Sequence, residues 1–328
     1  MNQFEYVRPA NVADAIAAAA APGAAYLASG TNLLDLMKGG IMRPSRLVDV
    51  SRLPGLDRIE RLDNGDVRIG ALARNADLAH DADFARSYPA IAEALLSGAS
   101  AQLRNAATLG GNLLQRTRCS YFYDTASACN KRAPGSGCDA HGGDNRLHAV
   151  LGWSDDCIAT HPSDLCVPLA AFEAIAEIEG RHGRREVAVE ALHRLPGATP
   201  DKDNTLEPGE LIVAVRLPAA ACSFASHARY LKLRERTSYA FALVSAAAGL
   251  VIDGDTIKEG ASHSAASPPS HGARVRRKRR LRAPAPSRPR FDAPPRQPSR
   301  AQSPLATTAS RSSSRRTIRC ASSILKPL

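Results

Sequence analysis

Five cysteines between positions 119 and 166 are the residues of this sequence best suited to metal chemistry. Their spacing is C-x9-C-x8-C-x18-C-x8-C, from Cys119 through Cys129, Cys138 and Cys157 to Cys166. Four thiolates suffice for a tetrahedral zinc ion or a [4Fe-4S] cluster. The wide separations argue against a zinc ribbon, whose cysteines come in closely spaced pairs. The spacing alone leaves both zinc and iron–sulfur open.

The cellular compartment bears on what these cysteines do. The N-terminus MNQFEYVRPANVADA lacks the basic-then-apolar pattern of an export signal, and no apolar run approaches the roughly 20 residues of a membrane span. We therefore expect a cytoplasmic protein without membrane contact. In a reducing compartment, clustered cysteines are more often metal ligands or redox groups than disulfides.

Two glycine-containing stretches resemble one another and suggest a second type of site. SGTNLLDL (29–36) and LGGNLLQ (109–115) each place glycine beside an Asn just before a Leu-Leu pair. Glycine lets the backbone approach a ligand closely, and a following helix N-terminus favours negative charge. Two such loops suit the two phosphates of a dinucleotide, although two ordinary glycine turns also explain them. Neither matches GxGxxG, so a nicotinamide-binding Rossmann unit is not supported.

The elements that must position these residues alternate between helix and strand. Apolar periodicity and glycine stops predict helices at 12–21, 31–40 and 87–100 and strands at 24–30, 46–51, 66–72, 173–180, 185–192 and 210–218. A small unit starts near 228, with the turn DGD between two strands. The pattern predicts an α+β protein.

The positive charge is confined to the C-terminal tail. Residues 261–328 contain 16 Lys and Arg and one acid, a net +15, whereas residues 1–260 carry −4. Pro, Ser, Arg and Ala dominate from Ala261 onward, which predicts disorder because little apolar surface is available for burial. Nucleic-acid binding through this tail is kept as an alternative function, but nucleic acid is not the partner we expect.

Four motifs in a fixed order carry a resemblance to a known family. LASGTNLLDLMK, IGALARNADLA, QLRNAATLGGNLLQ and HPSDLCVPLAA resemble the FAD-binding subunit of the molybdenum hydroxylases, the xanthine dehydrogenase and aldehyde oxidoreductase group. The resemblance implies the two-part α+β FAD-binding domain of that family at 1–222, with an insertion at about 117–160. Residues 223–260 would begin a small α+β C-terminal domain, truncated here and followed by the tail 261–328.

The resemblance also implies which residues bind FAD. The second pyrophosphate loop would use Thr108, Gly110, Gly111 and Asn112, and Asp164 and Lys232 would touch the flavin nucleotide. The first loop and its flanks would use Tyr26, Leu27, Ala28, Ser29, Gly30, Thr31, Asn32, Leu33 and Leu34.

The insertion resembles that of three-subunit aldehyde oxidoreductases of the periplasmic bacterial type, which carries a [4Fe-4S] cluster. This resemblance implies Cys119, Cys129, Cys138 and Cys157 as ligands, with the GSG at 135–137 beside the cluster. Cys166 lies after HPSD among apolar neighbours, which suits a buried free thiol. Three histidines are further possible ligands: His141, His148 and His161. Five Lys and Arg residues could offset the negative charge of a cluster, although a solvated surface explains them equally well: Arg116, Arg118, Lys131, Arg132 and Arg146.

The family's chemistry implies an electron-transfer role, with no catalytic residue for substrate oxidation in this chain. Electrons from an aldehyde would pass from a molybdenum-cofactor large subunit through a [2Fe-2S] small subunit to FAD here, and then to an external acceptor. An alternative is a subunit like that of hydroxybenzoyl-CoA reductase, in which electrons run toward the substrate. Export of the folded complex on a partner's signal would make the location periplasmic.

The sequence departs from the family after about Gly260. Relatives continue from a DGxTI hairpin with a segment like ARIALGGVAxKPWR, whereas this chain has ASHSAASPPSHGA. With permitted codon choices, the same nucleotides spell IPLGGVATKPWR one base out of register. We therefore hypothesise a frameshift near Gly260, in the gene or in its sequencing. The +15 charge would then have no partner.

Overall fold

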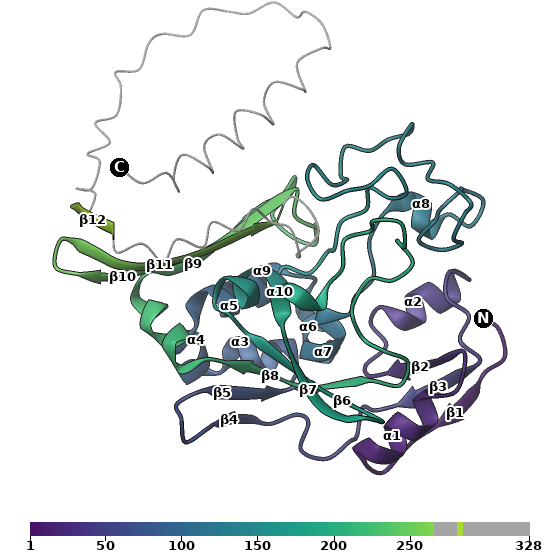
Figure 1. The fold of residues 1–328 in the computed structure, drawn as a ribbon, viewed down its shortest axis with the longest axis horizontal. Coiled ribbons are helices and arrows are strands. Elements are labelled where there is room, and N and C mark those ends of the chain that lie inside the picture. The colour runs from purple at the N-terminus through teal and green to yellow at the C-terminus, as the bar shows by residue number, and fades with distance from the viewer. Residues whose placement is uncertain (266–280, 285–328) are drawn as a thin grey trace, which may run out of the picture. The chain divides into compact units, whose positions relative to one another are not determined.

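The computed structural model describes residues 1–265 and 281–284 (Figure 1). The described residues form two compact units. The first comprises residues 1–251 and 260–265, and the second comprises residues 252–259 and 281–284. Strand β11 (Thr256–Ala265) continues past the compositional change at 261, and β12 covers Leu281–Pro284. The predicted disorder and the frameshift hypothesis otherwise concern residues outside the described part of the chain.

A small parallel sheet forms the N-terminal part. Its order is β1 (Glu5–Val7), β3 (Arg46–Asp49) and β2 (Ala24–Leu27). Helix α1 (Val12–Ala19) begins where the side chain of Asn11 accepts a hydrogen bond from the Asp14 N–H. Its buried Ile16 packs with Val48 and Val213, which joins this part to the next sheet. Helix α2 (Leu33–Lys38) follows β2 through the first glycine loop.

An antiparallel sheet of five strands carries the main core. Its order is β4 (Ile59–Arg61), β5 (Val67–Gly70), β8 (Leu211–Leu217), β6 (Ile175–Gly180) and β7 (Gly183–Ala188). One apolar cluster joins its strands to the helices, including Ile69 and Val215 from the sheet and Leu78, Ile91 and Leu109 from the helices. The helices that pack in this part are α3 (Asn75–His80), α4 (Ala82–Ser87), α5 (Pro89–Ser97), α6 (Ala101–Ala106), α7 (Leu109–Leu113), α9 (Cys166–Ala171) and α10 (Val189–Leu192).

The chain after β8 passes through the 3-10 helix η1 (Ala219–His227) into a further antiparallel sheet. Its order is β12, β11, β10 (Val244–Asp253) and β9 (Ala228–Leu233). The backbone N–H of Tyr230 on β9 donates to the Glu93 carboxylate on α5 at 2.8 Å. The insertion at 117–160 contains little regular structure, with helix α8 at Ser120–Tyr123.

Most predicted elements are present with slightly shorter bounds, but the strand predicted at 185–192 is wrong in its second half. Strand β7 ends at Ala188, and Val189–Leu192 is the short helix α10. Val189 and Leu192 are both buried and lie three positions apart, which places them on one helical face. In so short a segment the apolar pattern fits both periods, and packing decides the outcome.

Gly70 is a position where the fold leaves no space for a side chain. A Cβ built there would lie 2.1 Å from the carbonyl oxygen of Leu56. We predict that Gly70→Ala lowers the free energy of unfolding by about 3 kcal/mol, because backbone must shift to relieve the overlap. Gly142→Ala, at an open position, should change it by less than about 0.5 kcal/mol. Denaturant unfolding of both variants measures this, and equal stabilities would contradict it.

Candidate flavin and metal sites

The first glycine loop connects β2 to α2 and is tied to the segment after the second loop. Gly30 has φ +74°, a backbone conformation that favours glycine. Asn32, at the start of α2, accepts a hydrogen bond through Oδ1 from the backbone N–H of Arg116 at 2.8 Å. This bond joins two segments that are 84 positions apart in the sequence. It holds the predicted first pyrophosphate loop beside the chain that leaves the second.

The second glycine loop is built into the start of α7. The Oγ1 of Thr108 accepts a hydrogen bond from the Gly111 N–H at 3.3 Å, as an N-cap residue does. The Gly110 N–H donates to the Ala71 carbonyl at 2.8 Å. A Cβ on Gly110 would lie 3.1 Å from the Cβ of Ala71, so this close approach to the end of β5 favours glycine.

The HPSD segment meets the second loop and a buried ion pair. The Oγ of Ser163 donates to Oδ1 of Asn112 at 2.8 Å. Asp164 accepts from Lys232 Nζ at 2.7 Å and from the Tyr230 hydroxyl at 2.6 Å. Only 8% of the Asp164 side chain and 3% of the Lys232 side chain are exposed.

The structure therefore brings Asp164 and Lys232 together, although the sequence motifs named them separately. Tyr230, which completes this arrangement, was missed by the sequence analysis. Alternation along ARYLKL places Tyr230 and Lys232 on the same face of β9, and this spacing was the available clue.

Breaking this ion pair should be costly. We predict that Lys232→Met lowers the free energy of unfolding by about 3–5 kcal/mol, because it leaves the Asp164 carboxylate buried without its counter-charge. The double variant Asp164→Asn/Lys232→Met should lose less than the single variant. Lys258→Met, in an exposed pair with Asp253, serves as the control and should cost at most about 1 kcal/mol. Denaturant unfolding tests the prediction, and a single variant as stable as the control would refute it.

Four cysteines of the insertion line one cavity. Cys119, Cys129, Cys138 and Cys157 all face it, together with Lys131 and Asp156. Three of the four are buried, Cys138 is half-buried, and all six cysteines of the described chain are free thiols. Strand-like pairing of Cys129 with Cys138 keeps two of the predicted ligands side by side. The sequence-predicted ligand set is thus gathered in one place.

The four thiols do not meet the spacing of ligands around one zinc ion. With a zinc–sulfur bond of about 2.3 Å, tetrahedral thiolates lie about 3.8 Å apart. Within the described ranges, the one set of three ligand groups whose atoms lie within 4.8 Å of one another is His161, Cys166 and His193, so the four thiols do not meet that spacing. Burial raises the pKa of Cys119, and it raises the pKa of Cys157 to about 11.

Polar contacts hold the loops around this cavity. The guanidinium of Arg132 donates to the carbonyls of Tyr121 and Phe122, each at 2.8 Å. Asn130 exchanges two hydrogen bonds with Gly137, at 2.7 and 2.8 Å. The N–H of Gly137 is therefore used by Asn130, which closes the turn before Cys138. The placement of the GSG beside a cluster stays a prediction.

The basic side chains of the region have different surroundings. Arg146 forms an exposed ion pair with Glu235, as a solvated surface residue does. Arg118 donates to the Tyr123 hydroxyl at 2.8 Å. Arg116 and Lys131 both form ion pairs with Asp203, and Lys131 is the one that lines the cysteine cavity.

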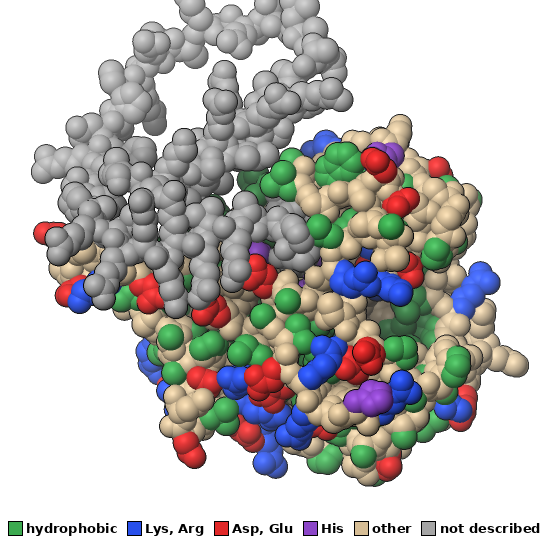
Figure 2. Space-filling model, in the orientation of Figure 1, with side chains coloured by type: hydrophobic (Ala, Val, Ile, Leu, Met, Phe, Trp, Pro, Cys, Tyr) green, Lys and Arg blue, Asp and Glu red, His purple; other side chains and the backbone are tan. Residues whose placement is uncertain are grey.

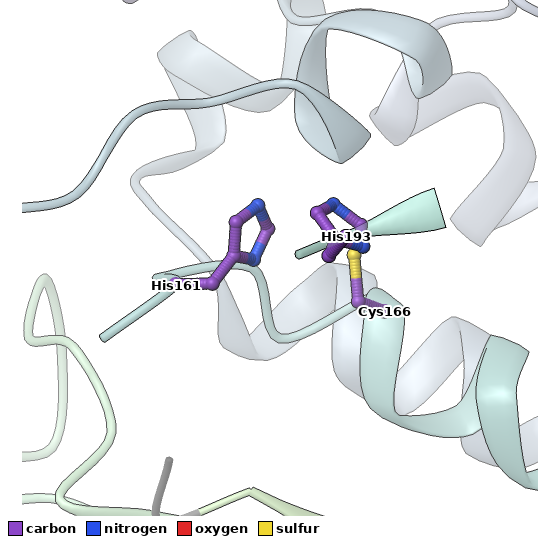
Figure 3. Close-up of side chains that lie close together, drawn as sticks. All are labelled: His161, Cys166 and His193. Atoms are coloured by element: carbon purple, nitrogen blue, oxygen red, sulfur yellow. The ribbon is translucent and has the colours of Figure 1, made fainter. Parts of the chain in front are cut away.

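The histidines weighed as ligands also differ. The Nε2 of His148 lies 3.1 Å from the sulfur of Cys119, and exposed His141 contacts the Ser154 carbonyl. His161 lies beside His193 and Cys166 and is not among the residues that line the four-cysteine cavity (Figure 3). Burial raises the pKa of Cys166 to about 12, in agreement with the predicted buried free thiol. His193 was missed by the sequence analysis because only folding brings it next to the HPSD segment.

Both imidazoles of this pair hold the end of α7. His161 and His193 donate through Nε2 to the Leu113 carbonyl, at 3.1 and 2.8 Å. The Nδ1 of His161 accepts from the Ser163 N–H at 3.3 Å, which fixes its neutral tautomer. Burial lowers the pKa of both residues below 6.5. The second glycine loop is thereby anchored by neutral histidines.

This burial predicts a pH dependence of stability. Because the folded-state pKa of His161 lies below its unfolded value of about 6.5, the unfolded state binds more protons in acid. The free energy of unfolding should fall as pH decreases from 7 to 5, by at most about 1.4 kcal/mol per pH unit for each such group. His161→Gln should make this fall shallower, whereas His227→Gln, at an exposed position, should leave it unchanged. Unfolding curves across this range test it, and parallel pH profiles would count against it.

Comparison with known proteins identifies the domain that contains the two glycine loops and the HPSD segment. A family model described as the FAD binding domain in molybdopterin dehydrogenase matches residues 2–220. The chain belongs to this family and is an oxidoreductase subunit of the molybdenum hydroxylase type. The resemblance found in the sequence, the α+β fold and FAD as cofactor are thus confirmed.

Individual relatives agree with this assignment. The chain is 52% identical over 256 residues to the aldehyde oxidoreductase FAD-binding subunit PaoB of Escherichia coli. The aligned region covers 77% of this chain and 79% of that protein. It is 29% identical over 221 residues to the carbon monoxide dehydrogenase medium chain of Hydrogenophaga pseudoflava, covering 67% and 60%. A solved structure of carbon monoxide dehydrogenase from that organism matches with a TM-score of 0.58 at 26% identity, covering 80% and 74%.

Among the residues that the structure describes, no helix is long and apolar enough to cross a membrane.

Proposed function

We propose that this chain is the FAD- and [4Fe-4S]-containing electron-transfer subunit of a molybdenum-dependent aldehyde oxidoreductase. The observation that carries the proposal is the convergence of Cys119, Cys129, Cys138 and Cys157 on one cavity, in a chain 52% identical to an aldehyde oxidoreductase FAD-binding subunit. A molybdenum-cofactor large subunit and a [2Fe-2S] small subunit would be its partners, and an external acceptor would take the electrons.

The flavin would be held by the two glycine loops. Residues from Tyr26 to Leu34 and the group Thr108, Gly110, Gly111 and Asn112 would line the diphosphate, and the glycines would let the backbone approach it closely. Gly30 supplies the left-handed turn, and Thr108 holds the Gly111 N–H. Bound FAD would accept electrons and pass them on, while the protein positions it and tunes its potential. Asp164 and Lys232 would contact the nucleotide as a fixed pair.

The insertion fits an iron–sulfur cluster better than a single metal ion. Its four thiols share one cavity, yet they are spaced more widely than ligands around one zinc ion. A four-iron cluster takes one thiolate at each corner and so requires this larger separation. Burial favours the protonated form of the Cys157 thiol. Binding of a cluster to the cysteines would therefore release thiol protons.

Two alternatives are less well supported. A subunit like that of hydroxybenzoyl-CoA reductase shares the expected insertion, but the 52% identity is to a subunit of an aldehyde oxidoreductase. The nucleic-acid alternative rests on the basic tail at 261–328, most of which lies outside the described residues. On the visible face of the described residues, Figure 2 shows Lys and Arg interspersed with Asp and Glu. A continuous basic surface, which phosphate binding favours, is not seen on that face.

Cofactor counting tests the proposal. After anaerobic co-purification with the two partner subunits, we expect one FAD, about four iron and about four sulfide per copy of this chain. Cys129→Ser should lose the iron and retain the flavin, because serine replaces one of the four ligands. Cys166→Ser is the matched control and should retain both. Flavin without iron in the unmodified protein would refute the cluster, and loss of iron from both variants would refute the ligand assignment.

A further inference from the structure

Lys131 places a fixed positive charge against the four-cysteine cavity. It follows Cys129 by two positions and lines the same cavity as all four thiols. Its side chain is only 9% exposed. The ammonium group donates to the Pro200 carbonyl at 2.7 Å and forms an ion pair with Asp203. These contacts hold the charge in one position and keep most water away from it.

The neighbouring charges leave a positive excess at this point. Asp203 is shared between Lys131 and Arg116, so the three side chains together carry one net positive charge. Asp156 also lines the cavity, but it is exposed, and water screens exposed charges more strongly than buried ones. Arg132 donates to backbone carbonyls and does not line the cavity. Lys131 is therefore the least screened charge that faces the thiols.

The charge of Lys131 faces the predicted ligands, because Lys131 and all four cysteines line one cavity. Its attraction would act on any negative charge held at the thiolates, and this attraction is stronger where water is excluded.

We propose that Lys131 tunes the reduction potential of the [4Fe-4S] cluster held by the four cysteines. This inference rests on the cluster of the proposed function. When the cluster accepts one electron, its net charge becomes one unit more negative. A buried ammonium group therefore stabilises the reduced form more than the oxidised form and raises the potential.

The experiment is a redox titration of the purified complex, followed by electron paramagnetic resonance of the reduced cluster. Lys131→Gln keeps a hydrogen-bond donor but removes the charge, and it should lower the midpoint potential. Lys131→Arg keeps the charge and should stay near the unmodified value. Lys202→Gln removes an exposed charge nearby and is the matched control, expected to leave the potential unchanged. Iron content is measured in every sample.

The outcomes separate this inference from the proposed function. An unchanged midpoint in Lys131→Gln with full iron content would overturn the inference and leave the cluster intact. Absence of iron from the unmodified protein would overturn both. If Lys131→Gln cannot retain iron, Asp203→Asn decides, because removing the offsetting carboxylate should raise the midpoint. A midpoint that does not rise in Asp203→Asn would then overturn the role of Lys131.

Discussion

The two candidate sites depend on the position of Arg116. Its backbone N–H donates to Asn32 at the first glycine loop, while its guanidinium forms an ion pair with Asp203. The same carboxylate holds Lys131 at the cysteine cavity. A single residue between the second glycine loop and the insertion therefore contacts both parts. Because the ion pairs around Asp203 are largely shielded from water, loss of one partner would leave charge buried at the junction.

The insertion shows how loops can gather four ligands with little regular structure. Backbone carbonyls near the cavity are satisfied by Arg132, and Asn130 closes the turn that carries Cys138. Such contacts fix chain direction, but they supply little apolar burial compared with the main core. A bound cluster would add the missing stabilisation, as structural metals do in small loop-rich units. The insertion therefore depends on polar contacts for its structure, whereas the rest of the domain depends on its apolar core.

Local sequence patterns predicted most of the helices and strands well, because each depends on neighbours within a few positions. The cysteine set came from the family resemblance. Gly30 has the left-handed backbone of a local turn, and Thr108 accepts a hydrogen bond from Gly111, three positions away. The contacts of His193 and Asp203 were not predictable, because their partners lie far away in the sequence. For Tyr230, alternation along β9 gave its face of the strand but not its bond to Asp164. The sequence alone left zinc and iron–sulfur both open for a similar reason. Spacing along the chain cannot give the separation of thiols in space.

The residues assigned to the flavin and cysteine sites lie before the compositional change near residue 260. Strand β9 ends at Leu233 and contributes Tyr230 and Lys232 to the pair with Asp164. Strand β10 pairs with β9 from Val244 to Gly249, and this pairing holds β9 in place. A change of reading frame near Gly260 would therefore leave the chemistry of both sites encoded. Its direct effect would fall on the elements after β10, and on none of the residues assigned to the two sites.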